Sequence, residues 1–400
     1  MSFVADRLSR IKPSPVSVMT KKCEELQRAG REVIQLNFGE PDFHTADHVA
    51  EAGIRAIREH NTMYTPQDGS WDMKLAVAAK LKRENGIDYG PDQVVITSGG
   101  KMVLYNALLA TINPGDEVII PAPYWVSYPD MAKLAEGVPV FVSCPQNNGF
   151  RMRPEDLAAA ITEKTRMLIL NTPSNPTGAA YGEDEIKAIA RVLLDHPHVM
   201  VLTDEIYEHI VYDGFKTASI AAVEPKLYDR TITMNGMSKG YFMTGWRIGF
   251  AAGPKSIIKA MSTLSSQNVS CPNTISQIAA IEALNGSDDY LKKNVAIFKE
   301  RRDMTVAHLN KCIGLSCHKP EGAFYVYPSC AGTIGKRMPS GKRIETDADF
   351  VMGLLETEGV AAVHGEAFGL SPYFRISYAL ATPDLQKALD RIQRFCASLR

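Results

Sequence analysis

A single lysine in a loop carries the clearest chemical signal in the sequence. Lys239 lies in the run NGMSKGYFMTGWRIG, directly after a predicted strand and among glycines and hydroxyl residues. A lysine amine forms a Schiff base with a carbonyl group when burial or a neighbouring cation lowers its pKa. Arg247, eight residues further on, could supply that cation and could also bind a phosphate through two hydrogen bonds. Taken alone, Lys239 is better explained as an ordinary solvated lysine.

A carboxylate ends another apolar strand, in the run LTDEIY. Active sites of open α/β sheets gather at such strand ends. There, Asp204 could keep a heteroaromatic nitrogen protonated, and Tyr207 could hydrogen-bond the substituents of the same ring. The alternative is that Asp204 only caps the N-terminus of a helix.

A phosphate site is indicated where a strand passes into a helix, in the run TSGGK that ends with Gly99, Gly100 and Lys101. Small residues, free N–H groups and the helix dipole favour an anion at such a point. The run lacks the GxxxxGK[ST] pattern of a nucleotide-binding P-loop. Two glycines after a strand can also form nothing more than a turn.

Three further residues could bind parts of an aromatic ligand or its substrate. Trp125, in PAPYWVSYP, could stack on an aromatic ring or simply belong to the core. Asn175 lies in NTPSNPTG, which is rich in turn-forming residues and could be only a loop. Arg375 lies inside the apolar strand YFRIS, where a buried guanidinium needs an anion such as a carboxylate. The alternative partner for Arg375 is an internal salt bridge.

Taken together, these runs describe one site. A Schiff-base lysine, an acid for a ring nitrogen, a phosphate site, a stacking aromatic and an arginine for a carboxylate are what pyridoxal phosphate needs to act on an amino acid. The residues therefore predict pyridoxal 5′-phosphate as the cofactor.

Short apolar runs alternate with helix-like stretches between about residues 90 and 250. This alternation predicts an α/β fold, with helices covering both faces of a parallel sheet. The predicted strands are 94–97, 117–120, 139–142, 167–171, 199–203 and 230–234, and the predicted helices among them are 125–136, 154–162 and 183–195.

The pattern changes after residue 250, where the strands become sparser and indicate a smaller α+β layer. A helical region is predicted from about 272 to 310, interrupted near Gly286, and short strands and a last helix follow at 323–327, 359–363, 373–377 and from about 382. No flexible linker separates the two parts, so we expect closely packed domains. The expected large domain covers 45–295, and the small domain is discontinuous, with 1–44 and 296–400.

Composition excludes several other functions. The 400 residues are 45% hydrophobic and 22% charged, and the formal net charge of -1 offers no basic field to nucleic acid or anionic lipid. No apolar run is long enough to span a membrane. The seven cysteines form no CxxC pair, and the N-terminus has no secretory signal pattern. We therefore expect a cytoplasmic protein with reduced thiols, no metal, and small molecules as its ligands.

Six runs in combination resemble the class I aminotransferases of fold type I: NPTG, DEIY, SKGYFMTGWRIG, PAPYWVSYP, PEGAFYVYPS and FRISYA. The similarity extends from about residue 5 to the C-terminus. It is strongest to the bacterial aspartate aminotransferase branch that also includes prephenate aminotransferases. The resemblance implies a large domain around a mainly parallel seven-stranded sheet, a smaller α+β domain, and a homodimer whose subunits share their active sites.

The resemblance also implies a role for each residue of the site. Lys239 would bind pyridoxal phosphate covalently and shuttle the proton, and Asp204 would pair with the pyridinium nitrogen. Tyr207 and Asn175 would hydrogen-bond the ring 3′-oxygen, and Trp125 would stack on the ring. The residues implied around the phosphate are Gly99, Gly100, Lys101, Ser238, Arg247 and Tyr64, the last reaching it from the other subunit.

For the substrate, the resemblance implies that Arg375 binds the α-carboxylate, helped by Asn175 and the backbone of Gly39. It also implies cis peptide bonds before Pro123 and Pro176, which would place Trp125 and Asn175.

Two departures from the wider family concern the substrate side chain. Many members carry an arginine near 265–268 for a distal carboxylate, whereas this chain has Ser-Ser-Gln-Asn there. In this branch Lys101 and Lys12 would take that role. Position 16, a threonine in prephenate-active members, is Val16 here, which argues against prephenate.

The implied activity is that of an aspartate transaminase, which moves the amino group of L-aspartate to 2-oxoglutarate in a ping-pong reaction and gives oxaloacetate and L-glutamate. The alternative is an aromatic amino acid or prephenate aminotransferase. Less well supported are a pyridoxal-phosphate lyase and a non-catalytic regulator. Against the regulator, we expect no DNA-binding arm before the domain.

Overall fold

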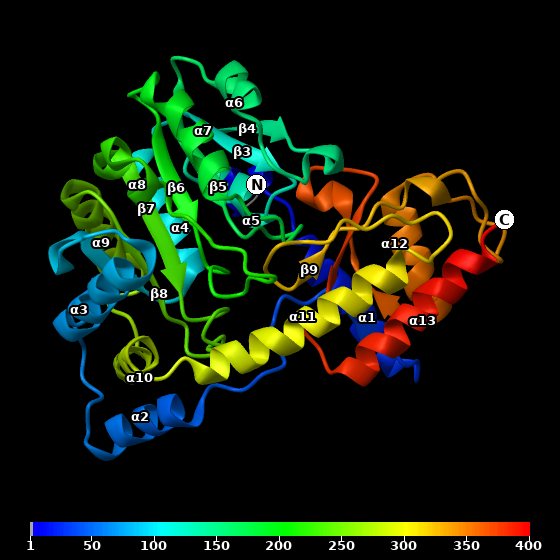
Figure 1. The fold of residues 1–400 in the computed structure, drawn as a ribbon, viewed down its shortest axis with the longest axis horizontal. Coiled ribbons are helices and arrows are strands. Elements are labelled where there is room, and N and C mark those ends of the chain that lie inside the picture. Colours follow the sequence, from blue (N-terminus) through cyan, green and yellow to red (C-terminus); the bar gives the residue numbers. More distant parts are fainter. Residues whose placement is uncertain (1–2) are drawn as a thin grey trace.

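The computed structural model describes residues 3–400, which form a central sheet between helices and a smaller layer beside it (Figure 1). The sheet has seven strands in the order β2-β8-β7-β6-β5-β3-β4. Their bounds are β2 Val94–Thr97, β3 Glu117–Ala122, β4 Val138–Ser143, β5 Thr165–Asn171, β6 Met200–Asp204, β7 Thr231–Gly236 and β8 Gly249–Ala252. All six strands predicted for this region are present, so the predicted α/β class is confirmed.

The sequence pattern does not predict one strand of the sheet, β8. β8 runs antiparallel to both of its neighbours, β2 and β7, whereas the other neighbouring strands pair in parallel. Its sequence, Gly-Phe-Ala-Ala, is short and holds one large apolar side chain, so it gives no clear strand pattern. A Cβ on Gly249 would collide with the backbone of Gly100. Glycine therefore allows β8 to lie against the start of the helix that follows β2.

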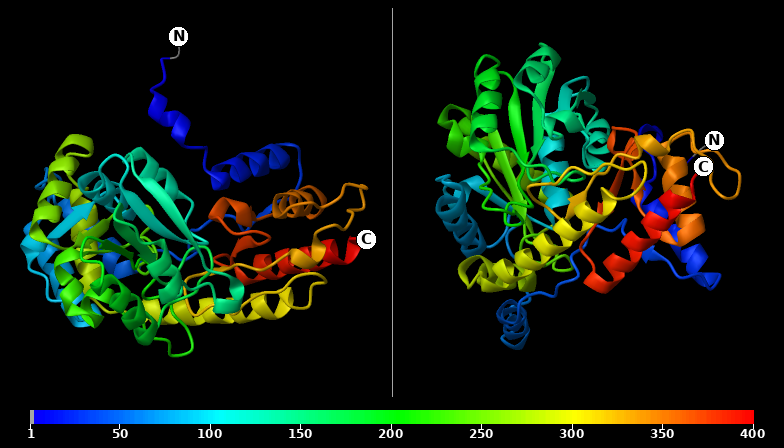
Figure 2. Two further views of the ribbon diagram at one scale, coloured as in Figure 1. Left: turned by 90° about the horizontal axis from the view of Figure 1, so that it is seen from above. Right: turned by 45° about the vertical axis from the view of Figure 1, so that its right-hand side comes forward.

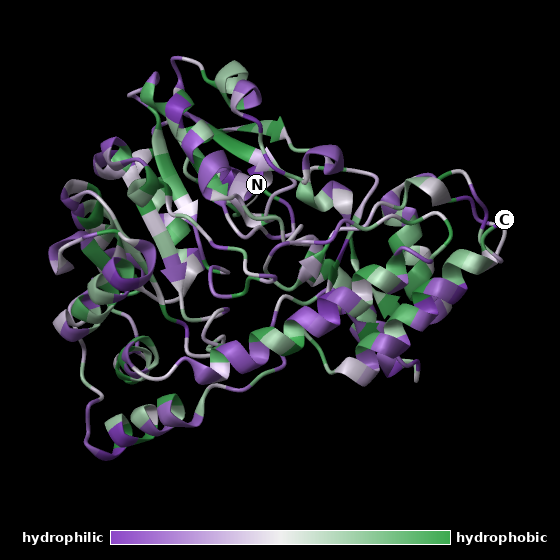
Figure 3. Cartoon of the chain, in the orientation of Figure 1, coloured by the Kyte–Doolittle hydropathy of each residue, from purple (hydrophilic) through white to green (hydrophobic). Residues whose placement is uncertain are grey.

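Alternate side chains of the central strands enter two separate cores. Ile120 and Ile169 pack in one core, and their neighbours Ile119 and Leu168 pack in the other. Helices cover both faces: α4 Gly100–Thr111, α5 Ser127–Leu134 and α9 Lys255–Asn268 on the first, and α6 Pro154–Ala160, α7 Glu183–Leu194 and α8 Ile220–Val223 on the second. Figure 3 shows hydrophobic residues along the central strands and mixed faces on the covering helices.

The smaller layer joins both ends of the chain. A three-stranded antiparallel sheet and a two-stranded parallel pair form its strands, in which Ile34 pairs with Val360. The strands are β1 Ile34–Gln35, β9 Tyr325–Val326, β10 Val360–Ala361, β11 Val363–His364 and β12 Phe374–Ser377, and the helices beside them are α1 Pro15–Arg28, α11 Asp289–Leu309, α12 Asp347–Glu358 and α13 Thr382–Ser398. The expected domain boundaries at 45 and 295 stay a prediction.

The remaining α-helices pack on one another, with α10 against α2 and α3, and α3 lies against β2. They are α2 Asp47–Arg58, α3 Trp71–Lys80 and α10 Thr274–Asn285. The helical region predicted from 272 to 310 is α10 followed by α11, interrupted at Gly286 as expected. The segment before α1 extends away from the rest of the chain (Figure 2, left). Within residues 3–400, no helix is long and apolar enough to cross a membrane.

Candidate active site

A cavity of about 340 Å³ opens at the carboxyl ends of the central strands, where the smaller layer meets the sheet. Its size suits a small-molecule ligand. The cavity brings together most of the residues predicted from the sequence, namely Gly39, Gly100, Lys101, Trp125, Asn175, Asp204, Tyr207, Ser238, Lys239, Arg247 and Arg375.

One end of the cavity is built for an anion. Gly99 precedes the first turn of α4 with φ +88°, and a Cβ at this position would collide with the guanidinium of Arg247. The first N–H groups of a helix lack partners within the helix, and its dipole attracts negative charge. Ser238 lines the same cavity. Helix N-terminus, guanidinium and hydroxyl together suit a phosphate.

Lys239 follows β7 and is not a solvated lysine. Its Nζ donates a hydrogen bond to the carbonyl oxygen of Gly39. Burial, together with the cations Arg375 and Arg247, lowers the pKa of the Lys239 ammonium from 10.5 to about 8, while Glu40 opposes this fall. The lowered pKa raises the share of the neutral amine, which is the form that attacks a carbonyl group.

Asp204 is the last residue of β6 and is only 4% exposed. Its Oδ2 accepts a hydrogen bond of 2.6 Å from the hydroxyl of Tyr128, and its Oδ1 accepts one of 3.3 Å from the N–H of Ile206. Burial raises the pKa of the Asp204 carboxyl to about 6, although both hydrogen bonds and Lys239 oppose this rise. The chain continues into a turn, so the alternative in which Asp204 caps a helix is wrong.

Two polar side chains beside Asp204 are fixed by neighbours. The Tyr207 hydroxyl lies 3.1 Å from that of Tyr325, and both are buried. The backbone N–H of Asn175 donates to Asn171 Oδ1 at 2.8 Å, and Asn171 Nδ2 donates to the backbone carbonyl oxygen of Asp204 at 2.9 Å. These bonds connect the loop after β5 with the end of β6. The peptide bonds before Pro123 and Pro176 are cis, as predicted, and so are those before two other prolines.

Arg375, on β12, is a buried cation held by two neutral partners. It is 2% exposed, and it donates to Asn175 Oδ1 at 2.9 Å and to the carbonyl of Asn37 at 2.6 Å. Its Nε is buried without a hydrogen-bond partner. Within residues 3–400, no carboxylate forms an ion pair with Arg375, so the alternative of an internal salt bridge is wrong. A buried guanidinium of this kind calls for a carboxylate ligand.

Trp125 and Lys101 form a further wall of the cavity. Trp125 is half-buried, and the Nζ of Lys101 lies 4.9 Å from the centroid of its ring. Burial lowers the pKa of Lys101, and Arg247 lowers it further. The wall therefore offers an aromatic face and a partly desolvated cation.

Lys12 and Tyr64 lie outside this cavity, whereas Val16 lines it. Lys12 lines a second cavity of about 420 Å³, which shares Lys101 and Arg247 with the first. Val16, near the start of α1, lines the first cavity. Tyr64 is 91% exposed and lines neither cavity. The run 265–268 ends α9 and packs on α4, where Asn106 Nδ2 donates to the hydroxyl of its first serine at 3.1 Å.

The geometry fits pyridoxal phosphate. The anion end would take the phosphate, Trp125 would face the ring, and Asp204 would meet the ring nitrogen. The best evidence is Asp204 itself, a buried carboxylate that faces the cavity and that a protonated nitrogen would pair. Arg375, at the other side, has an unpartnered Nε for a substrate carboxylate.

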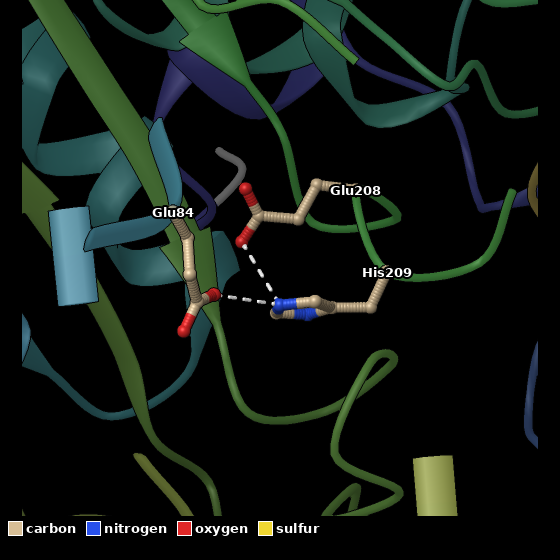
Figure 4. A group of neighbouring side chains, drawn as sticks. All are labelled: Glu84, Glu208 and His209. Carbon is tan, nitrogen blue, oxygen red and sulfur yellow. Dashed lines mark hydrogen bonds and ion pairs between the residues drawn. The ribbon is translucent and has the colours of Figure 1, made fainter. Parts of the chain in front are cut away.

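Another charged group lies behind the cavity, where Glu84, Glu208 and His209 converge (Figure 4). The Nε2 of His209 lies 2.9 Å from Glu84 and 3.8 Å from Glu208. The Nζ of Lys80, which has no exposed side-chain surface, forms ion pairs with both carboxylates. Because Lys80 supplies the positive charge that these carboxylates require, we assign no metal here.

The same group supports the cofactor loops. Lys80 Nζ also donates to Asn85 at 2.7 Å, and Glu208 accepts hydrogen bonds of 2.6 Å from both Asn85 and Asn235. Asn235 lies in β7, four residues before Lys239. Asp204 and Tyr207 line the cavity, whereas Glu205 and Glu208 join this network instead. Buried polar bonds therefore hold both loops from behind.

Comparison with known proteins agrees with this site. Residues 31–392 match the family of class I and II aminotransferases. The chain is 56% identical over 400 residues to a probable aspartate/prephenate aminotransferase of Rhizobium leguminosarum bv. phaseoli, with 100% of both chains covered. The aspartate aminotransferase from Rhizobium meliloti has a crystal structure with a TM-score of 0.98 and 50% identity, again covering 100% of both. The aspartate aminotransferase from Thermus thermophilus with maleate has a TM-score of 0.91 at 39% identity, covering 99% and 100%.

The fold and the site thus define a pyridoxal-phosphate enzyme of fold type I. The chain belongs to the class I and II aminotransferase family. It is an aminotransferase, its cofactor is pyridoxal 5′-phosphate, and its substrates are amino acids and 2-oxo acids.

Four residues that hydrogen-bond the side chains of the site are not predicted from the sequence: Tyr128, Asn171, Tyr325 and Asn37. A signal existed for Tyr128, because it lies three residues after Trp125 on a predicted helix and therefore near the same face. The partners of Arg375 had no local signal, since they come from distant segments.

Proposed function

We propose that this enzyme moves the amino group of L-aspartate to 2-oxoglutarate, giving oxaloacetate and L-glutamate in ping-pong order. The observation that carries the proposal is a pair of cations in one cavity, of which Arg375 is buried and Lys101 is partly desolvated. Arg375 has no carboxylate partner among the described residues, and Lys101 lines another part of the same cavity. Two such cations suit a dicarboxylate. The relatives named aspartate aminotransferases, one of them with maleate, support the same reading.

Each residue has a step in this proposal. When bound, pyridoxal phosphate withdraws electrons from the substrate Cα and makes its proton removable. Arg375 binds the α-carboxylate and fixes the substrate. Lys239, with its lowered pKa, would take the proton from Cα as a base and return it to the cofactor carbon two bonds away. Asp204 holds the proton on the ring nitrogen, and Tyr207 and Asn175 orient the ring through its 3′-oxygen.

A panel of amino acids mixed singly with the holoenzyme tests the substrate. Aspartate and glutamate should convert the cofactor absorbance to that of its amine form faster than alanine, phenylalanine or leucine, because only the first two fill both cation sites. One oxo acid should form per cofactor, whereas a lyase would release ammonia. Faster conversion by an uncharged amino acid would contradict the proposal.

Lys101→Met should lower kcat/KM for aspartate by about 10- to 150-fold, which is the loss in specificity expected when one charge-assisted hydrogen bond is removed. Methionine keeps most of the volume and removes the charge. The kcat/KM for alanine should change much less, because alanine has no distal carboxylate. The measured quantity is the aspartate-to-alanine ratio in both proteins. Lys12→Met tests the second predicted cation, and a ratio altered only by Lys12→Met would move the distal site to the adjoining cavity. The matched control is Lys226→Met, at an exposed lysine that lines neither cavity.

A second candidate is an aromatic amino acid or prephenate activity. Val16 gives an apolar wall to the first cavity, and the second cavity adds Met102, Tyr105 and Met131 beside Lys101. This apolar space could take a ring. Prephenate as amino acceptor and phenylalanine as donor belong in the same panel, and rates above those with 2-oxoglutarate and aspartate would favour this candidate.

We further propose that the enzyme is a cytoplasmic homodimer with shared active sites and with domains at 45–295 and at 1–44 plus 296–400. The exposed ring of Tyr64, outside its own cavity, supports a role at the phosphate of the other subunit. All seven cysteines are free thiols, and six are buried, which suits a reducing compartment.

A further inference from the structure

Tyr128 contacts the carboxylate that the cofactor ring requires. Its hydroxyl donates a hydrogen bond of 2.6 Å to Asp204 Oδ2. Both residues are buried, at 2% and 4% exposure. Within residues 3–400, this is the only side-chain hydrogen bond that the Asp204 carboxylate accepts. Tyr128 is thus the one side chain of the described chain placed to control Asp204 directly.

The position of Tyr128 is fixed by its helix. It lies on α5, one turn after Trp125, and the two rings meet edge to face with centroids 5.4 Å apart. The other oxygen of Asp204 accepts the N–H of Ile206, and the Asp204 backbone carbonyl accepts Asn171. Both carboxylate oxygens and the backbone of Asp204 are therefore held, so its side chain has one orientation in the cavity.

The chemistry needs Asp204 in its ionised form. A neutral carboxyl group cannot hold a proton on the ring nitrogen, and burial favours that neutral form. The titratable groups that face Asp204 are Tyr128 on α5, Tyr207 after β6 and Lys239 after β7. Burial raises the pKa of the Tyr128 hydroxyl well above 10, so this group remains a donor at physiological pH.

We propose that Tyr128 is a positioning residue for the aminotransferase reaction, whose hydroxyl keeps Asp204 ionised and aimed at the ring nitrogen of the cofactor. The inference deepens the proposed function, but it rests on the cofactor site and not on the choice of aspartate as substrate. Tyr128 itself need not touch substrate or cofactor. Its effect passes through Asp204.

Tyr128→Phe in the holoenzyme is the first test, because it removes the hydroxyl and keeps the ring against Trp125. Single-turnover conversion should slow by about ten- to a hundredfold, the effect of losing a hydrogen bond to a charged group. Without substrate, the pH at which the cofactor absorbance changes should rise. A protonated ring nitrogen repels a second proton on the cofactor and so lowers the pKa of that second group. Once the ring nitrogen has lost its proton, this repulsion is gone and the second pKa is higher. Tyr181→Phe is the matched control, since this buried hydroxyl accepts the N–H of Met152 at 2.7 Å outside the site.

A double-variant cycle separates positioning from a general structural effect. In an Asp204→Asn background, Tyr128→Phe should slow the reaction by less than about threefold, because the group on which it acts is already gone. If the rate losses of Asp204→Asn and Tyr128→Phe multiply in the double variant, the proposal is overturned. It is also overturned if the absorbance titration of Tyr128→Phe is not shifted. The rates use the best amino acid of the panel. If that amino acid is not aspartate, the proposed substrate is wrong, but the role of Tyr128 can still be tested with the amino acid that reacts best.

Discussion

Lys239→Ala should reduce turnover by at least about 10²- to 10⁴-fold, which is the usual contribution of a positioned general base. The physical reason is that the variant lacks the buried amine whose pKa is lowered to about 8. No other lysine replaces it, because Lys101 lies over Trp125 on the cavity wall. The variant should still bind the cofactor, since the helix N-terminus at Gly100 and the guanidinium of Arg247 remain.

The measurements are steady-state turnover and the cofactor absorbance of the purified variant. In the unsubstituted enzyme, borohydride should fix the cofactor to Lys239, as peptide mass analysis would detect. The exposed Lys226 offers the control substitution Lys226→Ala, which should leave both turnover and trapping unchanged. Trapping on a different lysine would contradict the role assigned to Lys239.

Lys80→Met should have the largest effect on stability, lowering the free energy of unfolding by about 3–5 kcal/mol. The side chain of Lys80 has no exposed surface, and its ammonium pairs with the buried carboxylate of Glu208. Methionine leaves that carboxylate buried without its cation. Urea unfolding of the holoenzyme followed by circular dichroism measures the change. Lys82→Met, which breaks an exposed pair with Asp88, should change stability by less than about 1 kcal/mol.

This pair also predicts a pH dependence. Burial opposes ionisation of Glu208, but Lys80 prevails and lowers the pKa of the carboxyl below 4.5. A carboxyl whose pKa is lower in the folded state stabilises the fold above its unfolded pKa, and this contribution is lost as the pH falls through the folded value. In Lys80→Met the uncompensated burial raises the pKa of Glu208, so the difference in stability between the two proteins should already shrink as the pH falls toward 4.5 and continue to shrink below it. An equal difference at pH 7 and at acid pH would contradict the pairing.

The parts of the molecule that could be predicted are those with a local signal. Strands β5 and β6 are continuous apolar runs, which mark a buried parallel sheet. Asp204 ends β6 and Lys239 follows β7, its parallel neighbour, so their meeting at one edge of the sheet follows from the topology. The same logic predicted the anion site at Gly99 and Gly100, because the strand-to-helix turn itself builds it.

The parts that could not be predicted depend on distant contacts. β8 is a strand because it lies between β2 and β7, not because of its own four residues. The partners of Arg375 come from residues 37 and 175, so no spacing reveals that it lacks an anion. In the sequence, Lys80 is one polar residue among several on a helix. Only the fold shows that its ammonium forms ion pairs with Glu84 and Glu208.

The two ends of the cavity come from different parts of the chain. The cofactor end is built from loops after β6 and β7 and is braced by the network around Lys80. By contrast, Val16 and Lys12 belong to the N-terminal segment, which has no share in that bracing. We therefore expect substitutions at Val16 and Lys12 to change which amino acid is accepted more than they change the rate of the reaction itself. Such an enzyme can diversify through a few residues at its entrance while its chemistry stays fixed.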